Sequence, residues 1–282
     1  MSDRVVLWSD GRLCDPATAT VPWADHGLTV GDGVFETIEL RNGQPFALTR
    51  HMDRLARSCV GMRLEPPGRD GLVRAVTAVA EAWGTGAGRL RITVTSGPGP
   101  MGSERGDGPA TLIVSATSMR IRTEATDVVT VPFTRNEHGA LAGLKTTSYA
   151  ENVLALQVAA DAGASEAILA NTAGLLCEGT GSNVFVGIDG RLVTPPLITG
   201  CLAGVTRALL LEALERAGAP AIEATTPIGD WPGVDEAFLL STGRHVQPIR
   251  RIDDVELAAC PGPLTWAAAR IWHETYAHAT DP

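Results

Sequence analysis

Lys145 is the first candidate for chemistry, because it is the only lysine in the sequence. The 282 residues contain 23 lysines and arginines together, and 22 of these are arginines. Arginine cannot replace a lysine whose amine must lose its proton and attack a carbonyl, since a guanidinium stays charged. A general bias towards arginine would also explain the count. Lys145 precedes a predicted helix, so its amine could project from a strand end into a cleft.

Three further segments place polar groups at turns. They are Glu178 with Gly179-Thr180-Gly181-Ser182, Gly204-Val205-Thr206, and Ser241-Thr242. The free N–H groups at a helix start, with the helix dipole behind them, bind anions, and Thr206 lies at such a start. A solvated carboxylate, ordinary helix capping and a plain turn would each explain one of these segments.

The composition excludes several classes of protein. The chain has a net charge of −9 and 20% charged residues, with no basic patch of the kind that nucleic acids require. It has no apolar run long enough to span a bilayer and no secretion pattern at its amino terminus. The five cysteines are widely spaced, as in a reducing compartment, and His273, Glu274 and His278 lack metal-ligand spacing. We therefore expect a cytoplasmic protein without a metal, a nucleic-acid partner or a membrane partner.

The elements that must position these residues mix strands and helices without regular alternation, which favours an α+β fold. Helices are predicted at 50–61, 69–83, 148–162, 204–217 and 264–278, the first with Thr49 as its N-cap. The apolar pattern gives way to a polar stretch at Ser118 to Asp127, which predicts a domain boundary there. We therefore expect a small N-terminal α/β domain at 1–118, a linker at 119–127 and a large C-terminal domain at 128–282. The glycine- and proline-rich loop at 96–109 is long enough for a ligand lid or a mobile segment.

Taken together, these residues resemble the class IV aminotransferase family in order and spacing. The resemblance is carried by Leu141-Ala142-Gly143-Leu144-Lys145, Glu178-Gly179-Thr180-Gly181-Ser182-Asn183-Val184-Phe185, Gly31-Asp32-Gly33-Val34-Phe35-Glu36-Thr37 and Arg50-His51-Met52-Asp53-Arg54-Leu55. It extends from about residue 4 to about residue 275. It implies the two-domain α+β fold of type IV pyridoxal-phosphate enzymes, with the C-terminal domain binding the cofactor, and a homodimer.

The resemblance also implies a role for each candidate residue. Lys145 would carry pyridoxal 5′-phosphate as a Schiff base and move the Cα proton of the substrate, and Glu178 would pair with the pyridine nitrogen. Leu202 would pack against the ring. The phosphate would be held by Arg50, Val205, Thr206, and Ser241 or Thr242, because arginine and helix N–H groups suit a phosphate dianion.

The residues that hold the substrate decide between members of the family. Phe35, Arg105 and Arg135 are the candidates, and either arginine could bind a substrate carboxylate. We expect a transaminase that moves an amino group between an amino acid and a 2-oxo acid, with D-enantiomers favoured and R-amines as further substrates. A 4-amino-4-deoxychorismate lyase that releases 4-aminobenzoate and pyruvate is the alternative. A non-catalytic small-molecule binder is a second alternative, although a binder has no need of both Lys145 and Glu178.

Overall fold

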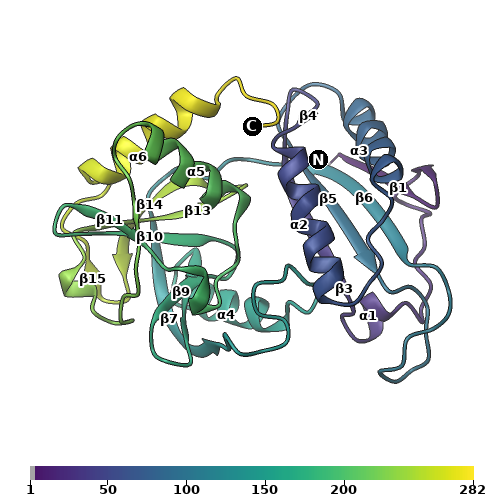
Figure 1. The fold of residues 1–282 in the computed structure, drawn as a ribbon, viewed down its shortest axis with the longest axis horizontal. Coiled ribbons are helices and arrows are strands. Elements are labelled where there is room, and N and C mark those ends of the chain that lie inside the picture. Colours follow the sequence, from purple (N-terminus) through teal and green to yellow (C-terminus); the bar gives the residue numbers. More distant parts are fainter. Residues whose placement is uncertain (1–3) are drawn as a thin grey trace. The chain divides into compact units, whose positions relative to one another are not determined.

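The computed structural model describes residues 4–282, and these form two compact units (Figure 1). The first unit comprises the described residues up to Arg120 together with Leu144–Tyr149 and Thr280–Pro282. The second comprises Ile121–Gly143 and Ala150–Ala279. The expected domains differ from these units chiefly at 144–149 and 280–282, which lie in the first unit. Residues 1–3, part of the segment without a secretion pattern, lie outside the described residues.

The first unit is an antiparallel sheet with helices. Its elements are β1 (Val5–Ser9), β2 (Arg12–Cys14), α1 (His26–Thr29), β3 (Gly33–Arg41), β4 (Gln44–Pro45), α2 (Leu48–Gly61), α3 (Arg69–Trp83), β5 (Gly88–Thr95) and β6 (Thr111–Ser118). Within residues 4–282 this sheet has six strands in the order β2-β1-β6-β5-β3-β4, each antiparallel to its neighbour.

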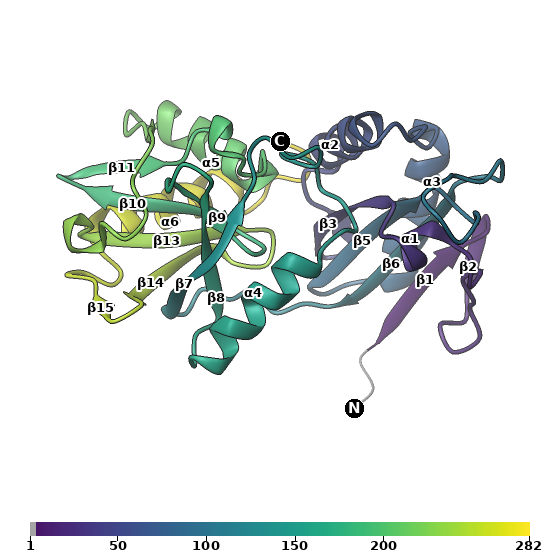
Figure 2. The ribbon, with the colours of Figure 1, turned by 90° about the horizontal axis from the view of Figure 1, so that it is seen from below.

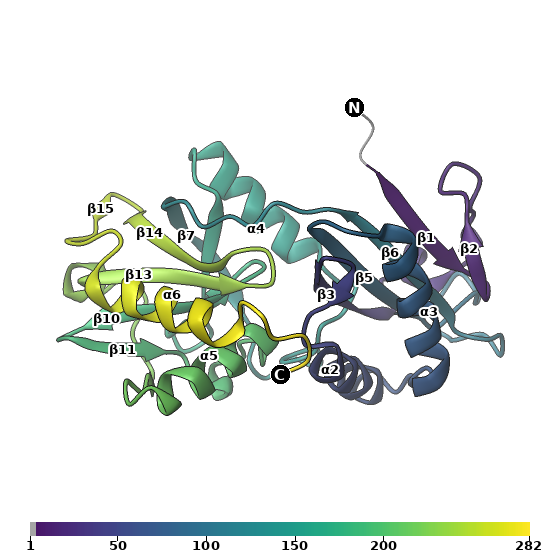
Figure 3. The same cartoon turned by 90° about the horizontal axis from the view of Figure 1, so that it is seen from above.

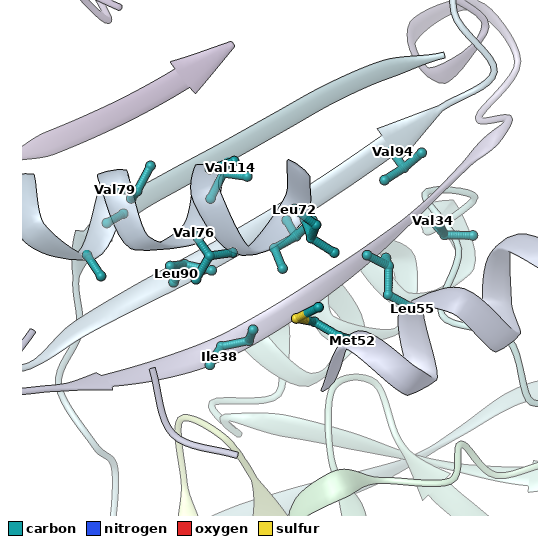
Figure 4. Packing of buried hydrophobic residues seen from close by; sticks show 14 of the residues in the cluster. Val34, Ile38, Met52, Leu55, Leu72, Val76, Val79, Leu90, Val94 and Val114 are labelled. Atoms are coloured by element: carbon teal, nitrogen blue, oxygen red, sulfur yellow. The ribbon is translucent and has the colours of Figure 1, made fainter. Parts of the chain in front are cut away.

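One face of this sheet carries the hydrophobic core. Alternate residues of the strands, such as Ile38 and Leu90, point to the same side, and α2 and α3 contribute Leu55 and Val76 to the same cluster (Figure 4). The two helices therefore cover one face of the sheet and leave the residues of opposite parity on the other face.

The start of α2 differs from the expectation. The prediction that Thr49 is the N-cap is wrong, because the N-cap is Ala47 in a left-handed conformation with φ 55°. Asp281 bonds the first turn instead, accepting from the N–H of Thr49 at 2.9 Å and from its hydroxyl at 2.6 Å. A carboxylate from the last residues thus does what a capping side chain does elsewhere.

The second unit is built on a mixed sheet. Its elements are β7 (Thr126–Arg135), α4 (Ala150–Asp161), β8 (Glu166–Asn171), β9 (Leu176–Gly179), β10 (Asn183–Ile188), β11 (Arg191–Thr194), a 3₁₀ turn (Leu197–Thr199), α5 (Val205–Arg216), β12 (Ile222–Glu223), a 3₁₀ turn (Trp231–Gly233), β13 (Glu236–Ser241), β14 (His245–Ile252), β15 (Val255–Glu256) and α6 (Pro263–Tyr276). Within the described residues the sheet runs β12-β11-β10-β13-β14-β7-β8-β9, with β15 paired to β14.

The sheet contains parallel pairs in two places, and one of them, β11 with β12, lies at an edge. β7 runs parallel to both β14 and β8, and most other pairs are antiparallel. The helix α4 packs on β7 and β8 through Ala155 and Ala159 (Figure 2). The helices α5 and α6 lie side by side, and the Tyr276 hydroxyl donates to the Leu209 carbonyl at 2.9 Å (Figure 3). The mixture of strand directions confirms the predicted α+β class.

No helix among residues 4–282 combines the length and the apolar character that crossing a membrane demands.

Candidate active site

Lys145 lies in a short segment of the first unit that pairs with the start of β3. The N–H of Phe35 donates to the Lys145 carbonyl at 3.0 Å, and Thr146 forms an antiparallel bridge with Val34. The N–H of Lys145 donates to the hydroxyl of Ser58, on α2, at 3.2 Å. Both the N–H and the C=O group of Lys145 are hydrogen-bonded. The orientation of its backbone, and so the direction in which its side chain points, is therefore fixed.

The amine of Lys145 lies against aromatic rings. Its Nζ is 4.3 Å from the centroid of the Phe35 ring and 5.8 Å from that of Tyr149. The two rings meet edge to face with their centroids 5.3 Å apart. Such contacts attract a cation and restrict the conformations of the lysine chain. The structure therefore brings together Lys145 and Phe35, two of the residues singled out from the sequence.

Arg91 lies on the same face of the sheet and was missed by the sequence analysis. It is opposite Thr37 in the β3–β5 register, two residues along from the Phe35–Thr93 pair. Its guanidinium carbon lies 3.8 Å from the centroid of the Phe35 ring, and its Nε donates to the Thr93 hydroxyl at 3.1 Å. Burial lowers the pKa of Arg91. Its position between Leu90 and Ile92 was the available signal, because alternation puts it on the face away from the core.

A buried ionic cluster lies between β3 and α2. Glu36 has the core-facing parity of β3 and is fully buried. It accepts hydrogen bonds from Arg54 at 2.7 and 2.6 Å and contacts Nδ1 of His51 at 2.7 Å. Burial alone would raise the pKa of Glu36, but the charge and hydrogen bonds of Arg54 and His51 lower it to about 2.

His51 links this cluster to Lys145 electrostatically. Burial is the main cause that lowers the pKa of His51, and Glu36 opposes it. The positive charges of Arg54 and Lys145 lower that pKa further, so both cations act at this imidazole. Arg54 lies within one of the motifs that resemble the family, but it is not among the site residues expected from the sequence. Its spacing of one helical turn from Arg50 was the signal for a second arginine on α2.

Glu178 lies on β9 in the second unit, and its side chain is nearly buried. Its Oε2 accepts the N–H of Leu202 at 2.9 Å, and its Oε1 lies 3.3 Å from Nε of Arg135. A terminal nitrogen of Arg135 donates to the Asn152 side-chain oxygen at 3.3 Å. The structure thus brings Glu178, Leu202 and Arg135 together, and it adds Asn152, for which the sequence offered no signal. The carboxylate is oriented at both oxygens.

The predicted anion site begins at the first turn of α5. Gly204 is extended, and a Cβ there would collide with the side chain of Asn183. Val205 and Thr206 are buried at the helix start. The turn after β13 carries Ser241 and Thr242 and closes with a hydrogen bond from the N–H of Arg244 to the carbonyl of Ser241, at 3.1 Å. The chemistry of these groups fits a phosphate, because helix N–H groups and hydroxyls donate hydrogen bonds.

The other two predicted arginines are engaged inside the first unit. Nε of Arg50 donates to the Pro282 carbonyl at 2.8 Å. Arg105 forms a two-point ion pair with Asp32, at 2.7 Å for each bond. It also donates to the carbonyls of Met62 and Arg63 at 2.7 and 2.8 Å. Arg105 therefore ties the loop at 96–109 to the residues that follow α2 and to the segment before β3.

The fold is that of known aminotransferases. The branched-chain amino acid aminotransferase of Escherichia coli superposes with a TM-score of 0.89 at 25% identity, covering 98% of this chain and 94% of that one. A fold IV transaminase from Curtobacterium pusillum superposes with a TM-score of 0.85 at 29% identity, covering 97% and 98%. The class defined by the fold is a pyridoxal-phosphate enzyme of fold type IV.

The sequence places the chain within that class. The model of the family "Amino-transferase class IV" matches residues 33–252, and the chain belongs to this family. A putative branched-chain-amino-acid aminotransferase of Methanocaldococcus jannaschii is 31% identical over 88% of each chain. A bifunctional aminodeoxychorismate lyase / D-amino acid transaminase of Mycobacterium tuberculosis is 30% identical over 76% of this chain and 79% of its own. The protein is therefore a pyridoxal-phosphate-dependent aminotransferase that acts on amino acids and 2-oxo acids.

Proposed function

We propose that this aminotransferase favours D-amino acids, accepts R-amines, and uses Lys145 as its catalytic residue. The observation that carries the role of Lys145 is the placement of the only lysine, with both backbone groups bonded and its amine 4.3 Å above the Phe35 ring. When bound, pyridoxal phosphate supplies an aldehyde and an electron-withdrawing ring that takes up the electron pair of a broken Cα–H bond. The amine of Lys145 attaches the cofactor and carries the proton from and to Cα.

Glu178 is proposed as the partner of the pyridine nitrogen. A carboxylate beside that nitrogen favours its protonated form, which withdraws electrons more strongly. The N–H of Leu202 and the guanidinium of Arg135 hold the carboxylate in place from both sides. In this proposal Arg135 orients Glu178, and Leu202 also packs against the ring.

The phosphate is proposed to bind to the start of α5 at Val205 and Thr206 and to the hydroxyls of Ser241 or Thr242. Arg50 remains a proposed phosphate ligand, because a guanidinium suits a phosphate dianion.

For the substrate carboxylate we propose Arg91 in preference to Arg105. The guanidinium of Arg91 lies on the Phe35 ring that also contacts Lys145, whereas Arg105 is engaged by Asp32 and two backbone carbonyls. Arg91→Met should raise KM for amino acids far more than it lowers kcat. Arg89→Met, an exposed change on the same strand, is the matched control and should leave KM unchanged. Equal KM values for the two variants would contradict this role.

The role of Lys145 is tested by substitution and chemical trapping. Purified protein should be yellow, and borohydride should fix the cofactor on a peptide that contains residue 145. Lys145→Ala should lower the rate by about 10²–10⁴-fold, the usual worth of acid–base catalysis. Lys145→Arg is the matched control for charge, because it keeps a cation over the rings but cannot act as a nucleophile. Either variant turning over amino acids at the wild-type rate would overturn the proposal.

The substrate class is tested by half-reactions. D-amino acids, L-amino acids including the branched-chain ones, and R-amines are each mixed with the holoenzyme, and the loss of the cofactor's absorbance is followed. The fastest conversion by D-alanine or D-glutamate would support the proposal. Faster conversion by L-leucine or L-valine would contradict it and favour a branched-chain enzyme.

A lyase is the second candidate, because the similar protein of M. tuberculosis carries both activities in its name. Aminodeoxychorismate should then yield 4-aminobenzoate and pyruvate without a 2-oxo acid acceptor. If this turnover greatly exceeds half-transamination by D-amino acids, the lyase is the main activity.

We also propose a homodimer. The helix α4 exposes four large apolar side chains, namely Val153, Leu154, Leu156 and Val158. An apolar helix face of this kind is typical of an interface between proteins. A single species of twice the chain mass in light scattering would support the proposal, and a monomer at micromolar concentration would contradict it.

A further inference from the structure

The second unit contains a buried carboxylate, Glu166, to which the proposed function gives no role. It lies at the start of β8 and is only 1% exposed. A buried charge is costly unless it is paired and hydrogen-bonded, so its partners show what it holds in place.

On one side, Glu166 holds the turn that follows Glu178. Its Oε1 accepts the N–H of Thr180 at 3.1 Å and also a short hydrogen bond from the Thr180 hydroxyl. Its Oε2 accepts the hydroxyl of Ser182 at 3.0 Å. A Cβ at Gly179 would collide with the Ser182 side chain, so the turn is packed tightly around the carboxylate.

This turn is connected back to Glu178 by side chains. The carbonyl of Thr180 accepts a short hydrogen bond from the Asn152 amide, whose oxygen accepts from Arg135 at 3.3 Å. Arg135 in turn lies 3.3 Å from Glu178. A displacement of Thr180 would therefore reach Glu178 by two routes, through β9 and through Arg135.

On the other side, Glu166 is paired with Arg244. A terminal nitrogen of Arg244 lies 3.3 Å from Oε2 of Glu166 and 3.2 Å from the Ser165 carbonyl. Arg244 is 8% exposed, and burial lowers its pKa. Its N–H closes the turn that carries Ser241 and Thr242. The two turns thus share one ion pair.

We propose that Glu166 and Arg244 are positioning residues that join the turn after Glu178 to the turn of Ser241 and Thr242. Neither residue touches the cofactor; the pair holds the groups for its ring nitrogen and for its phosphate at a fixed separation. This inference rests on the proposed function, which assigns those two turns to the two ends of pyridoxal phosphate.

The experiment compares Glu166→Gln with Glu236→Gln. Glu236 is a matched control: it is a glutamate of the same unit, 3% exposed, and it accepts the N–H groups of Leu264 and Thr265 at the start of α6. Both variants lose a buried carboxylate and some stability. Only Glu166→Gln should weaken the Kd for pyridoxal phosphate, by about tenfold or more, which corresponds to about 1.4 kcal/mol. Only it should change the visible circular dichroism of the bound cofactor, a signal of ring orientation.

Two further variants keep the test decisive if Glu166→Gln does not fold. Thr180→Val removes one hydroxyl from Glu166, and Arg244→Met removes the cation. Each should weaken cofactor binding and change the same dichroism signal. The inference would be overturned if both variants bound the cofactor and gave its dichroism as the wild type does. It would also be overturned if Glu166→Gln and Glu236→Gln had the same Kd for pyridoxal phosphate and the same dichroism.

Glu178→Gln, measured alongside, separates this failure from that of the proposed function. An unchanged cofactor spectrum in Glu178→Gln would overturn the role of Glu178 and the positioning with it. A changed spectrum there, with Glu166→Gln resembling Glu236→Gln, would overturn the positioning alone.

Discussion

Each of the two units buries a glutamate beside an arginine, but the two carboxylates are held by different chemistry. Glu36 is surrounded by ionisable groups, with two bonds to Arg54 and one to His51. Glu166 is bonded mainly by neutral donors of Thr180 and Ser182, and its arginine lies farther away at 3.3 Å. The first carboxylate balances charge between a strand and a helix, whereas the second fixes the shape of a turn. Substitution should therefore damage stability most at Glu36 and cofactor binding most at Glu166.

The largest expected effect on stability is that of Glu36→Gln. It leaves Arg54 buried without a counter-charge, which should cost about 3–5 kcal/mol of the free energy of unfolding. Glu39→Gln is the matched control, because Glu39 lies on the same strand and its partner Arg41 is 20% exposed. Urea unfolding of both variants measures the difference. If both variants lose the same free energy of unfolding, the counter-charge that Glu36 provides to Arg54 is not what stabilises the protein.

The next effect is a loss of stability in acid. The pKa of Glu36 is lowered from 4.5 to about 2, so its contribution is present above pH 4.5 and is lost as the pH falls towards 2. By linkage this is worth about 3 kcal/mol. The lowered pKa of His51 adds a loss that begins below its ordinary value of 6.5, because the unfolded chain then binds a proton that the folded chain resists. Unfolding of Glu36→Gln should depend less on pH below 4.5 than that of the wild type; an identical dependence would contradict this account.

Glu166→Gln should have a smaller effect on stability, of about 1–3 kcal/mol, because the amide oxygen still accepts one of the neutral donors. Thermal melts of the cofactor-free protein measure it against Glu36→Gln. If Glu166→Gln lost as much stability as Glu36→Gln, the two glutamates would not differ in how their surroundings stabilise them.

The smallest effect is expected at the surface. Arg105→Gln breaks an ion pair whose arginine side chain is 36% exposed, and this should cost less than about 1 kcal/mol. Because Arg105 ties the loop at 96–109 to Asp32 and to the residues that follow α2, limited proteolysis should cut this loop faster in the variant. Asp53→Asn, which breaks another exposed ion pair of the same unit, is the control and should leave the cleavage rate unchanged. Unchanged cleavage in Arg105→Gln would show that other contacts hold the loop.

The sequence supported the α+β class and most element positions, because periodicity and turn residues are local signals. The limits of α3, for example, agree with those expected. It did not reveal Arg91 or the network around Glu166, since these depend on strand register and on contacts between residues distant in the chain. Arg105 illustrates the same limit: its residue type suits a carboxylate, but only the fold shows that Asp32 already engages it.

The chain path also has a consequence for biosynthesis. The first unit includes Leu144–Tyr149 and Thr280–Pro282, and Asp281 bonds the opening turn of α2. A ribosome that has made the first 120 residues has therefore not yet made everything that this unit contains. The first unit can therefore be completed only after the second unit has been translated, and α2 stays incompletely capped until Asp281 has been made.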